Sequence, residues 1–356
     1  MNQPPQSSLA GEPQRYSRDP VASNAVLDIR DLHTYFTTKE GTIKGVNGVS
    51  LTLQENSILG LVGESGSGKT VTALSILQLV PSPGKIVKGR IWYNGHNLLS
   101  LDSDEMRRIR GVEISLIFQD AAAALNPVLK VGGQLEEIML EHTDMGLRQA
   151  RSKSVELLTE MGIPDARRML DRYPFQLSGG MAQRVMMAIS VALKPRVLVA
   201  DEPTSNLDVT LQAEMLDRLR QLRKENRTSI ILITHDLGVI AQTADTVAVM
   251  YGGSIAETAE TRALFKRPLH PYTWGLFQAL PRLDTPSRML RPIRGSAPTM
   301  LDPPDQCPYI HRCPKATNQC RTDPRPKLVE VEPGRKVACY NPMAPSEAGL
   351  ARKTAG

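Results

Sequence analysis

The sequence predicts an α/β fold with a parallel sheet at its core. Three short apolar runs, at 57–62, 197–200 and 229–234, are typical of buried strands. Patterns at helical spacing occupy 70–79 and 209–227. Because strands that alternate with helices form a parallel sheet, these segments define the predicted core. The 356 residues, of which 41% are hydrophobic and 22% charged, suffice for a full core and two or three domains.

The part of the chain around the first core strand predicts a second, smaller sheet. Strand-like segments at 26–32, 46–53 and 89–94 are separated by glycines, which favours an antiparallel sheet beside the parallel one. A charged helical segment follows at 98–111. The next strand, 112–118, is expected to return to the core.

A helical insertion is predicted between two core strands, from about residue 120 to 178. Leu135, Ile138 and Met139 recur there at helical spacing, and prolines interrupt the segment. A hairpin is expected at 246–257. The core with its insertion is therefore expected to span 25–260.

Prolines become frequent after residue 260, which predicts a separate C-terminal extension at 261–343. It is expected to be rich in loops and not to continue the α/β core. Residues 1–24 are polar and contain prolines, which predicts a disordered tail and not a secretory signal. Residues 344–356 are expected to form a second tail.

The charge and hydropathy of the chain restrict its partners only weakly. The net charge is +6 and the pI is near 9.1, an excess that suits nucleic acid, anionic lipid or nucleotide. No run of about 18 apolar residues is present, so the chain is not expected to span a membrane.

A glycine-rich motif joins the first core strand to the helix that follows it. Residues 63–70 have the pattern G-x-x-x-x-G-K-T of the phosphate-binding P-loop. Glycines let the backbone approach a phosphate, and the helix N-terminus points its N–H groups at the same anion. Lys69 is expected to reach the β- and γ-phosphates of ATP, and the Thr70 hydroxyl to bind Mg²⁺. The predicted nucleotide-binding residues of this motif are Gly63, Glu64, Ser65, Gly66, Ser67, Gly68, Lys69 and Thr70.

A second motif lies where another core strand ends. The apolar run 197–200 places Asp201 at the carboxyl end of its strand, where open α/β sheets bind ligands. Asp201 is expected to hold Mg²⁺ opposite Thr70. Glu202 follows directly and is expected to orient and polarise the attacking water. After a P-loop, this Asp-Glu pair predicts nucleotide hydrolysis.

A third motif, Leu-Ser-Gly-Gly at 177–180, lies between the other two. With this set, the chain from about 26 to 340 resembles the ATP-binding subunits of ABC transporters. The resemblance implies that Gln119 binds Mg²⁺ and senses the membrane partner, and that His235 contacts the γ-phosphate. It also implies that 205–208, ending at Asp208, forms the D-loop beside the nucleotide.

The same resemblance implies how adenine and the second ATPase subunit are contacted. Phe36 falls where the family stacks an aromatic ring on adenine, with Tyr35 as the alternative. Two such subunits face each other head to tail. Ser178 and Gly180 open a helix, so their N–H groups can reach a γ-phosphate held by the partner. Half of each site then lies in trans, and the chain is not expected to hydrolyse ATP alone.

The C-terminal extension narrows the resemblance. Residues 267–273 resemble the start of the extension in dipeptide and oligopeptide importers. All four cysteines lie between 307 and 339, and a protein that binds intracellular nucleotide works in a reducing compartment, which argues against disulfides. The gaps of 5, 6 and 18 residues do not match the usual spacing of zinc ligands. The sequence therefore predicts a [4Fe–4S] cluster, with zinc or four free thiols as alternatives, on Cys307, Cys313, Cys320 and Cys339.

The expected function is hydrolysis of ATP to power the import of di- or oligopeptides or a related small substrate. The expected partners are a second ATPase subunit of different sequence, two transmembrane permease subunits and an extracytoplasmic substrate-binding protein. The chain is expected at the cytoplasmic face of the bacterial inner membrane. The alternative is a soluble ABC ATPase that acts on nucleic acid or ribosomes. Such proteins usually carry two cassettes or a long coiled-coil insertion, and this chain shows neither, so nucleic acid is not an expected partner.

Overall fold

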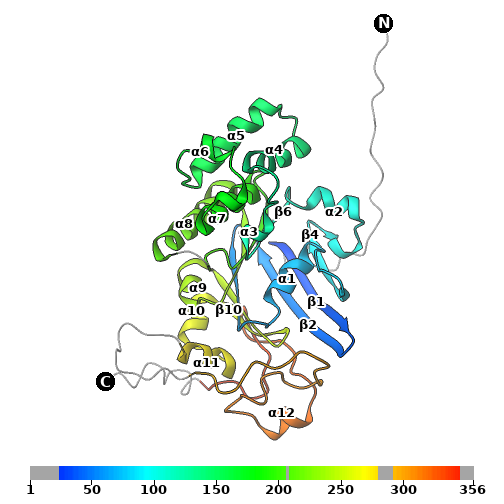
Figure 1. Ribbon diagram of the computed structural model, residues 1–356. Coiled ribbons are helices and arrows are strands. Elements are labelled where there is room, and N and C mark those ends of the chain that lie inside the picture. The colour runs from blue at the N-terminus through cyan, green and yellow to red at the C-terminus, as the bar shows by residue number, and fades with distance from the viewer. Residues whose placement is uncertain (1–23, 206–207, 280–291, 345–356) are drawn as a thin grey trace, which may run out of the picture.

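The structure of the chain, a computed structural model, describes residues 24–205, 208–279 and 292–344 (Figure 1). Most of both predicted tails lies outside these ranges. The central sheet has eight strands: β3 (Ile58–Val62), β6 (Ile114–Ile117), β7 (Val197–Asp201), β8 (Ser229–Thr234), β9 (Thr246–Tyr251), β10 (Ser254–Glu260), β11 (Val329–Glu332) and β12 (Arg335–Val337). Their order is β11-β12-β10-β9-β3-β8-β7-β6, and the five strands from β9 to β6 are parallel.

Helices cover one face of this sheet, and the antiparallel sheet described below covers much of the other, which explains why its central strands are apolar on both sides. Every residue of β3, β7 and β8 is buried, as expected for parallel strands that are covered on both faces. The helices outside the insertion are α1 (Lys69–Ile76), α2 (Ser103–Ile109), α7 (Gly179–Val191), α8 (Val209–Asn226), α9 (Leu237–Thr243), α10 (Thr261–Lys266), α11 (Pro271–Gln278) and α12 (Asn318–Thr322). The predicted α/β class is confirmed.

The second sheet is antiparallel, as predicted, with the order β2-β1-β4-β5. Its first two strands are longer than the apolar pattern indicates, because β1 and β2 remain paired through polar residues up to Thr38 and Gly41. A short 3₁₀ helix and α2 follow it. The bounds are β1 (Ala25–Thr38), β2 (Gly41–Gln54), β4 (Gly84–Tyr93), β5 (His96–Asn97), η1 (Leu98–Ser100) and α2 (Ser103–Ile109).

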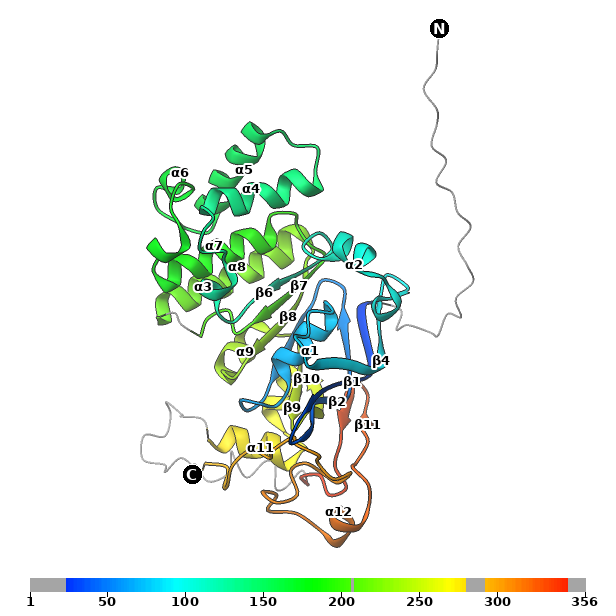
Figure 2. The same cartoon turned by 45° about the vertical axis from the view of Figure 1, so that its right-hand side comes forward.

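The predicted insertion between β6 and β7 is helical. Leu135 and Met139 are fully buried and pack in the same cluster as Val185 of α7. The insertion lies at the opposite end of the molecule from α12 in both views (Figures 1 and 2). Its elements are α3 (Ala121–Ala124), α4 (Val131–His142), α5 (Leu147–Glu160), α6 (Ala166–Met169) and η2 (Pro174–Gln176).

The C-terminal extension differs from its prediction, because two of its strands continue the core sheet. β12 pairs antiparallel with β10, and β11 pairs with β12. The alternation of Val329 to Glu332 and the turn at Pro333-Gly334 are strand and turn signals that the proline-rich surroundings obscure. The two strands cover the hydrogen-bonding edge that β10 would otherwise expose.

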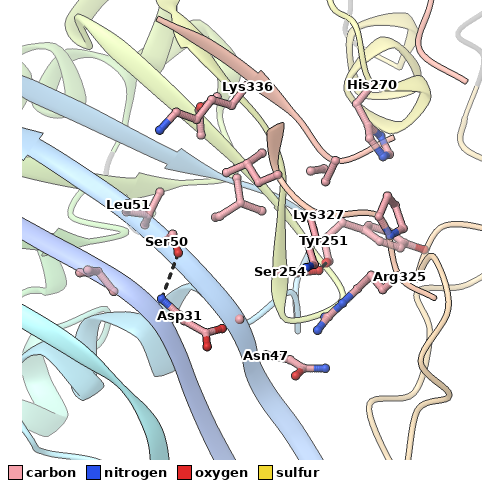
Figure 3. Close-up of a pocket in the computed structure, with 18 of the residues that line it drawn as sticks. Asp31, Asn47, Ser50, Leu51, Tyr251, Ser254, His270, Arg325, Lys327 and Lys336 are labelled. Atoms are coloured by element: carbon pink, nitrogen blue, oxygen red, sulfur yellow. Dashed lines mark hydrogen bonds between the residues drawn. The ribbon is translucent and has the colours of Figure 1, made fainter. Parts of the chain in front are cut away.

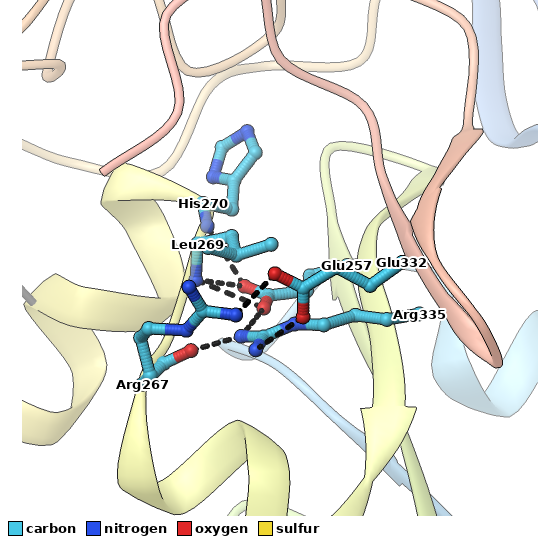
Figure 4. A network of polar contacts seen from close by, with 6 residues as sticks. All are labelled: Glu257, Arg267, Leu269, His270, Glu332 and Arg335. Carbon is cyan, nitrogen blue, oxygen red and sulfur yellow. Dashed lines mark hydrogen bonds and ion pairs between the residues drawn. The ribbon is translucent and has the colours of Figure 1, made fainter. Parts of the chain in front are cut away.

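A buried ion-pair network fastens the start of the extension to the core sheet (Figure 4). The fully buried carboxylate of Glu257 accepts hydrogen bonds from the backbone N–H groups of Leu269, at 2.9 Å, and His270, at 2.8 Å. It also pairs with Arg335 at 3.0 Å. Arg335 in turn donates to the carbonyl of Arg267. Strand β10, strand β12 and the segment before α11 thus meet on one carboxylate.

His270 makes the folded state sensitive to acid. Its Nδ1 accepts a hydrogen bond from the Tyr272 N–H at 3.0 Å and so caps α11. Complete burial lowers the pKa of His270 to about 4, against an ordinary value of 6.5. Below pH 6.5 the unfolded chain therefore takes up a proton that the folded chain excludes until about pH 4.

We therefore expect the contribution of His270 to the free energy of unfolding to be complete above pH 6.5 and to be lost between pH 6.5 and pH 4. The loss from this one residue is about 3 kcal/mol. Urea unfolding of wild type and His270→Asn, which retains a capping side chain, measures it. The variant should lose this part of the pH dependence, whereas His96→Asn, at an exposed histidine, should keep it. Equal pH profiles for wild type and His270→Asn would refute the assignment.

A cavity of about 1160 Å³ is lined by β1 and β2, by β9 and β10 of the central sheet, and by the extension (Figure 3). Asp31, Ser50, Arg325 and Lys327 are among its lining residues. None of residues 63–70 lines it, so this cavity is separate from the predicted nucleotide site. Among the described residues, no helix combines the length and the apolar character needed to cross a membrane.

Candidate active site

The glycine-rich loop, residues 63–68, joins β3 to α1 at the carboxyl edge of the sheet. Gly68 has a φ of +105°, and a Cβ there would lie 2.2 Å from the carbonyl oxygen of Gly45. A Cβ on Gly63 would lie 2.1 Å from the carbonyl oxygen of Met250. Only glycine fits at these two positions, so the loop keeps the tight path that brings backbone N–H groups to a phosphate.

Lys69 begins α1 and turns its side chain back into the loop. Its Nζ donates to the carbonyl oxygens of Gly63 and Glu64, both at 2.9 Å. Burial lowers the pKa of Lys69, and the carboxylates of Glu202 and Asp201 oppose that shift. The ammonium group is therefore held between the loop and the acidic pair at the end of β7.

Asp201 is the carboxylate whose surroundings fit Mg²⁺. Its Oδ1 is buried and has no hydrogen-bond partner among the described residues. Burial raises the pKa of Asp201, and the neighbouring Thr70 hydroxyl and Lys69 ammonium act against that rise. Mg²⁺ commonly binds proteins through one carboxylate, with substrate phosphates completing its shell. The unpartnered oxygen beside a hydroxyl matches that ligand set.

Glu202 lies between two polar side chains that follow the neighbouring strands. Gln119, after β6, donates from Nε2 to Glu202 at 3.2 Å, and His235 Nδ1, after β8, lies 3.3 Å from the other carboxylate oxygen. Glu202 has a φ of +46°, in the left-handed region that non-glycine residues seldom adopt. Its N–H donates to the Ile233 carbonyl at 2.9 Å, which anchors this backbone conformation. Strain of this kind gathers at functional sites.

The two candidate adenine-stacking residues have different surroundings. The hydroxyl of Tyr35 hydrogen-bonds to Asn47 and to His33, each at 3.0 Å, so this side chain is already engaged. A Cβ on Gly45 would lie 3.1 Å from the Phe36 ring, and Gly45 itself contacts Gly68 of the loop. Phe36 and the phosphate-binding loop thus share Gly45 as a neighbour.

The Leu-Ser-Gly-Gly segment opens α7. The Ser178 hydroxyl caps this helix by accepting a hydrogen bond from the Met181 N–H at 3.3 Å. Ser178 is exposed and Gly180 half-buried. In both views α7 lies apart from α1, the helix that follows the loop, and packs near α8 and the insertion (Figures 1 and 2).

Asp208, the last residue of the predicted D-loop, caps α8. Its carboxylate accepts a hydrogen bond from the Leu211 N–H at 2.9 Å. Residues 206–207 of the same predicted segment lie outside the described residues. Of this segment the structure thus describes only its two ends, Ser205 and Asp208.

Two residues that contact the loop were not singled out by sequence reasoning. The Tyr272 hydroxyl accepts a hydrogen bond from the Glu64 N–H at 2.9 Å, and Arg312 pairs with the Glu64 carboxylate at 2.7 Å. Tyr272 falls within the 267–273 motif, which was the only signal in the sequence. Arg312 carries no local signal, because its partner lies 248 positions earlier in the chain.

Comparison with known proteins identifies the family. Residues 46–205 match the family model described as ABC transporter, and residues 256–320 match the model described as Oligopeptide/dipeptide transporter, C-terminal region. The chain is 46% identical to the Dipeptide transport ATP-binding protein DppD of Bacillus subtilis over 83% of its own length and 88% of that protein. The chain belongs to the family of ABC transporter ATP-binding proteins. The predicted family and the predicted ATPase class are confirmed.

A further relative and a solved structure support the same family assignment. The Oligopeptide transport ATP-binding protein OppD of Salmonella typhimurium is 42% identical, over 91% of this chain and 96% of that protein. The dimeric structure of the ATP-binding cassette MJ0796, bound to ADP and Pi in a post-hydrolysis state, aligns with a TM-score of 0.61 at 25% identity. The alignment covers 66% of this chain and 99% of that cassette, so the ABC cassette accounts for about two thirds of the chain.

The predicted iron–sulfur cluster is wrong. The four cysteines line one small cavity, but in the part of the chain that the structure describes no three His, Cys, Asp or Glu side chains are grouped to hold a metal ion. Cys307 and Cys313 instead pack against the apolar core. Burial raises the pKa of Cys307 to about 11 and that of Cys339 to about 12, so both are protonated thiols in the metal-free protein at neutral pH. Cys320 is buried as well.

Proposed function

We propose that this chain is the ATP-hydrolysing subunit of an ABC transporter that imports di- or oligopeptides. The observation that carries this proposal is the match of residues 256–320 to the C-terminal region of oligopeptide and dipeptide transporters, on a chain that also has the ABC motifs. We place the ATPase domain at 25–260, with its helical insertion at 120–178, and the extension at 261–343.

In this proposal the loop residues 63–70 bind the triphosphate of ATP. The loop N–H groups and Lys69 contact the phosphates, and the Phe36 ring stacks on adenine. Thr70, Asp201 and Gln119 hold Mg²⁺, which would neutralise charge on the transferred phosphate.

Glu202 is proposed to accept hydrogen bonds from the attacking water. Its two neighbours, Gln119 and His235, hold the carboxylate at the edge of the sheet where β6, β7 and β8 end. His235 also contacts the γ-phosphate from its own chain. Gln119 joins the active site to the helical insertion, so it can transmit nucleotide binding to the permease.

The second half of each site is proposed to come from another ATP-binding subunit. Because α7, the helix that Ser178 and Gly180 open, lies apart from α1, these two residues are positioned for a γ-phosphate held by a partner, and Asp208 contributes at the same interface. The partner is proposed to be a different chain. Two transmembrane permeases and an extracytoplasmic binding protein complete the transporter, and this subunit binds the cytoplasmic face of the bacterial inner membrane.

The alternative of a soluble ABC ATPase acting on nucleic acid or ribosomes is not favoured. It rests on the net charge of +6 alone and leaves the match of residues 256–320 without an explanation. The assembled transporter in lipid vesicles should accumulate a labelled di- or tripeptide only when ATP is supplied. ATP hydrolysis stimulated by RNA and not by the binding protein with peptide would support the alternative.

Two variants distinguish the two halves of the proposed site. Lys69→Ala removes charged hydrogen bonds and should weaken ATP binding by the isolated subunit about 10- to 100-fold. Ser178→Arg should leave that binding near wild type but abolish hydrolysis at one site of the assembled transporter, because its target phosphate lies in the partner. Equilibrium ATP binding and steady-state hydrolysis measure the two effects.

Two exposed positions serve as controls for these variants. Lys39→Ala and Ser152→Arg make the same changes at exposed positions and should behave as wild type. Full ATPase activity of a purified monomer would refute the two-chain site. Unchanged ATP binding in Lys69→Ala would refute the role of that lysine.

A further inference from the structure

Arg312 of the C-terminal extension reaches the phosphate-binding loop of the ATPase core. Its Nη1 lies 2.7 Å from the Glu64 carboxylate and donates to the Tyr251 hydroxyl at 3.1 Å. Its Nε donates to the Arg294 carbonyl at 2.9 Å. The Arg312 side chain is 8% exposed and that of Glu64 is 25% exposed, so this ion pair is partly shielded from solvent.

A second contact holds the same loop residue. The Tyr272 hydroxyl, from α11, accepts the hydrogen bond of the Glu64 N–H at 2.9 Å. Glu64 is the second residue of the phosphate-binding loop. Its backbone and its side chain are thus each bound by a residue that follows the core in sequence.

These contacts rest on a rigid aromatic cluster. The ring of Tyr251 lies 4.4 Å from that of Tyr272 and 5.2 Å from that of Tyr309, centroid to centroid. All three side chains are buried. Tyr309 and Arg312 belong to the same turn of the extension, so packing of Tyr309 against the core also sets the position of the Arg312 guanidinium.

The negative charge of Glu64 would repel the phosphates of bound ATP if it were not paired. A carboxylate in this loop sits beside the site proposed for a triphosphate, and like charges at short range repel. Arg312 neutralises this carboxylate and keeps its side chain turned toward the extension. Without Arg312, the Glu64 charge would be left partly buried and uncompensated beside the incoming phosphates.

We propose that Arg312 is a positioning residue for ATP binding, through which the docked extension neutralises Glu64 and sets the nucleotide affinity of the core. This inference rests on the proposed ATP site. Because coupling free energies are reciprocal, bound ATP in turn favours the docked position of the turn that carries Arg312.

The test is ATP binding by the full chain, together with the KM and kcat of the assembled transporter. Arg312→Ala should weaken ATP binding about tenfold, which corresponds to one charge contact at an intermediate dielectric. The effect should appear in KM for ATP, with kcat changed less than about twofold, because Arg312 does not reach the reacting atoms. Arg312→Lys should retain part of the affinity.

The decisive variant is Arg312→Ala combined with Glu64→Gln. If Arg312 acts by neutralising Glu64, removing both charges should restore affinity to within about threefold of wild type, a non-additive result. If Arg312 only supports the fold, the second substitution should not rescue binding, and the proposal is overturned. Thermal unfolding of each variant shows whether lost affinity follows lost stability.

Two controls separate failure of this inference from failure of the proposed function. Arg321→Ala removes an exposed arginine from the same extension and should leave ATP affinity unchanged. Wild type that binds no ATP would refute the proposed function itself. If the wild-type protein binds ATP, and Lys69→Ala loses this binding while Arg312→Ala keeps it, only the role of Arg312 is refuted.

Discussion

Glu202→Gln is expected to lower ATP hydrolysis by about 10²-fold or more while ATP binding stays near wild type. The amide keeps the size of the carboxylate, but it has lost the charge that polarises the attacking water. Gln119, at 3.2 Å, can still donate to the amide oxygen, and His235, at 3.3 Å, can accept from the amide NH2 group when its Nδ1 carries no proton, so the site should keep its shape. Lys69 and Thr70 are untouched, so the triphosphate and Mg²⁺ should still bind.

Steady-state hydrolysis by the assembled transporter and equilibrium binding of ATP by the subunit measure the two halves of this prediction. Glu225→Gln makes the same change at an exposed position of α8 and should hydrolyse ATP at the wild-type rate. Near-normal turnover of Glu202→Gln in the assembled transporter would remove Glu202 from its proposed role. Loss of binding together with turnover would instead indicate a structural role.

Glu257→Ala is expected to destabilise the protein by about 3–5 kcal/mol, a large part of the stability of a typical domain. The carboxylate is fully buried, and its removal leaves the guanidinium of Arg335 without its buried partner. It also leaves two buried backbone N–H groups, those of Leu269 and His270, without their acceptor. Each of these three losses carries its own desolvation cost.

Urea unfolding, followed by circular dichroism, measures the loss for Glu257→Ala. Glu260→Ala removes an exposed carboxylate from the same strand and should change stability by less than about 0.5 kcal/mol. Because the network joins β10 to the extension, protease cleavage after residue 260 should also rise in Glu257→Ala. A variant as stable as Glu260→Ala would show that the network contributes nothing to stability.

Local signals in the sequence account for most of the ATPase core. The loop 63–68 is contiguous with the strand before it and the helix after it, so one stretch of sequence contains the whole phosphate-binding unit. Asp201 and Glu202 follow a buried strand directly, which places them at the carboxyl edge of the sheet. Such motifs can be interpreted without tertiary contacts because the residues that make them are neighbours in the chain.

The extension shows where this reasoning fails. Strand β12 joins the sheet by pairing with β10, about 80 positions earlier, and β11 pairs with β12. Pairing between strands so far apart in the chain is not a local property. The cysteine count and spacing suggested a metal centre. Two of these side chains, Cys307 and Cys313, instead pack against the apolar core, which no spacing reveals.

The sequence by itself determined the α/β class, the ABC motifs and the acidic pair that ends β7, because each depends on residues close together in the chain. Only the tertiary structure decided that Gly45 lies between Phe36 and the loop while the Tyr35 hydroxyl is bonded to Asn47, and that Arg312 meets Glu64. Long-range pairs such as these form only once the chain has folded and buried side chains have lost water, so no local pattern encodes them.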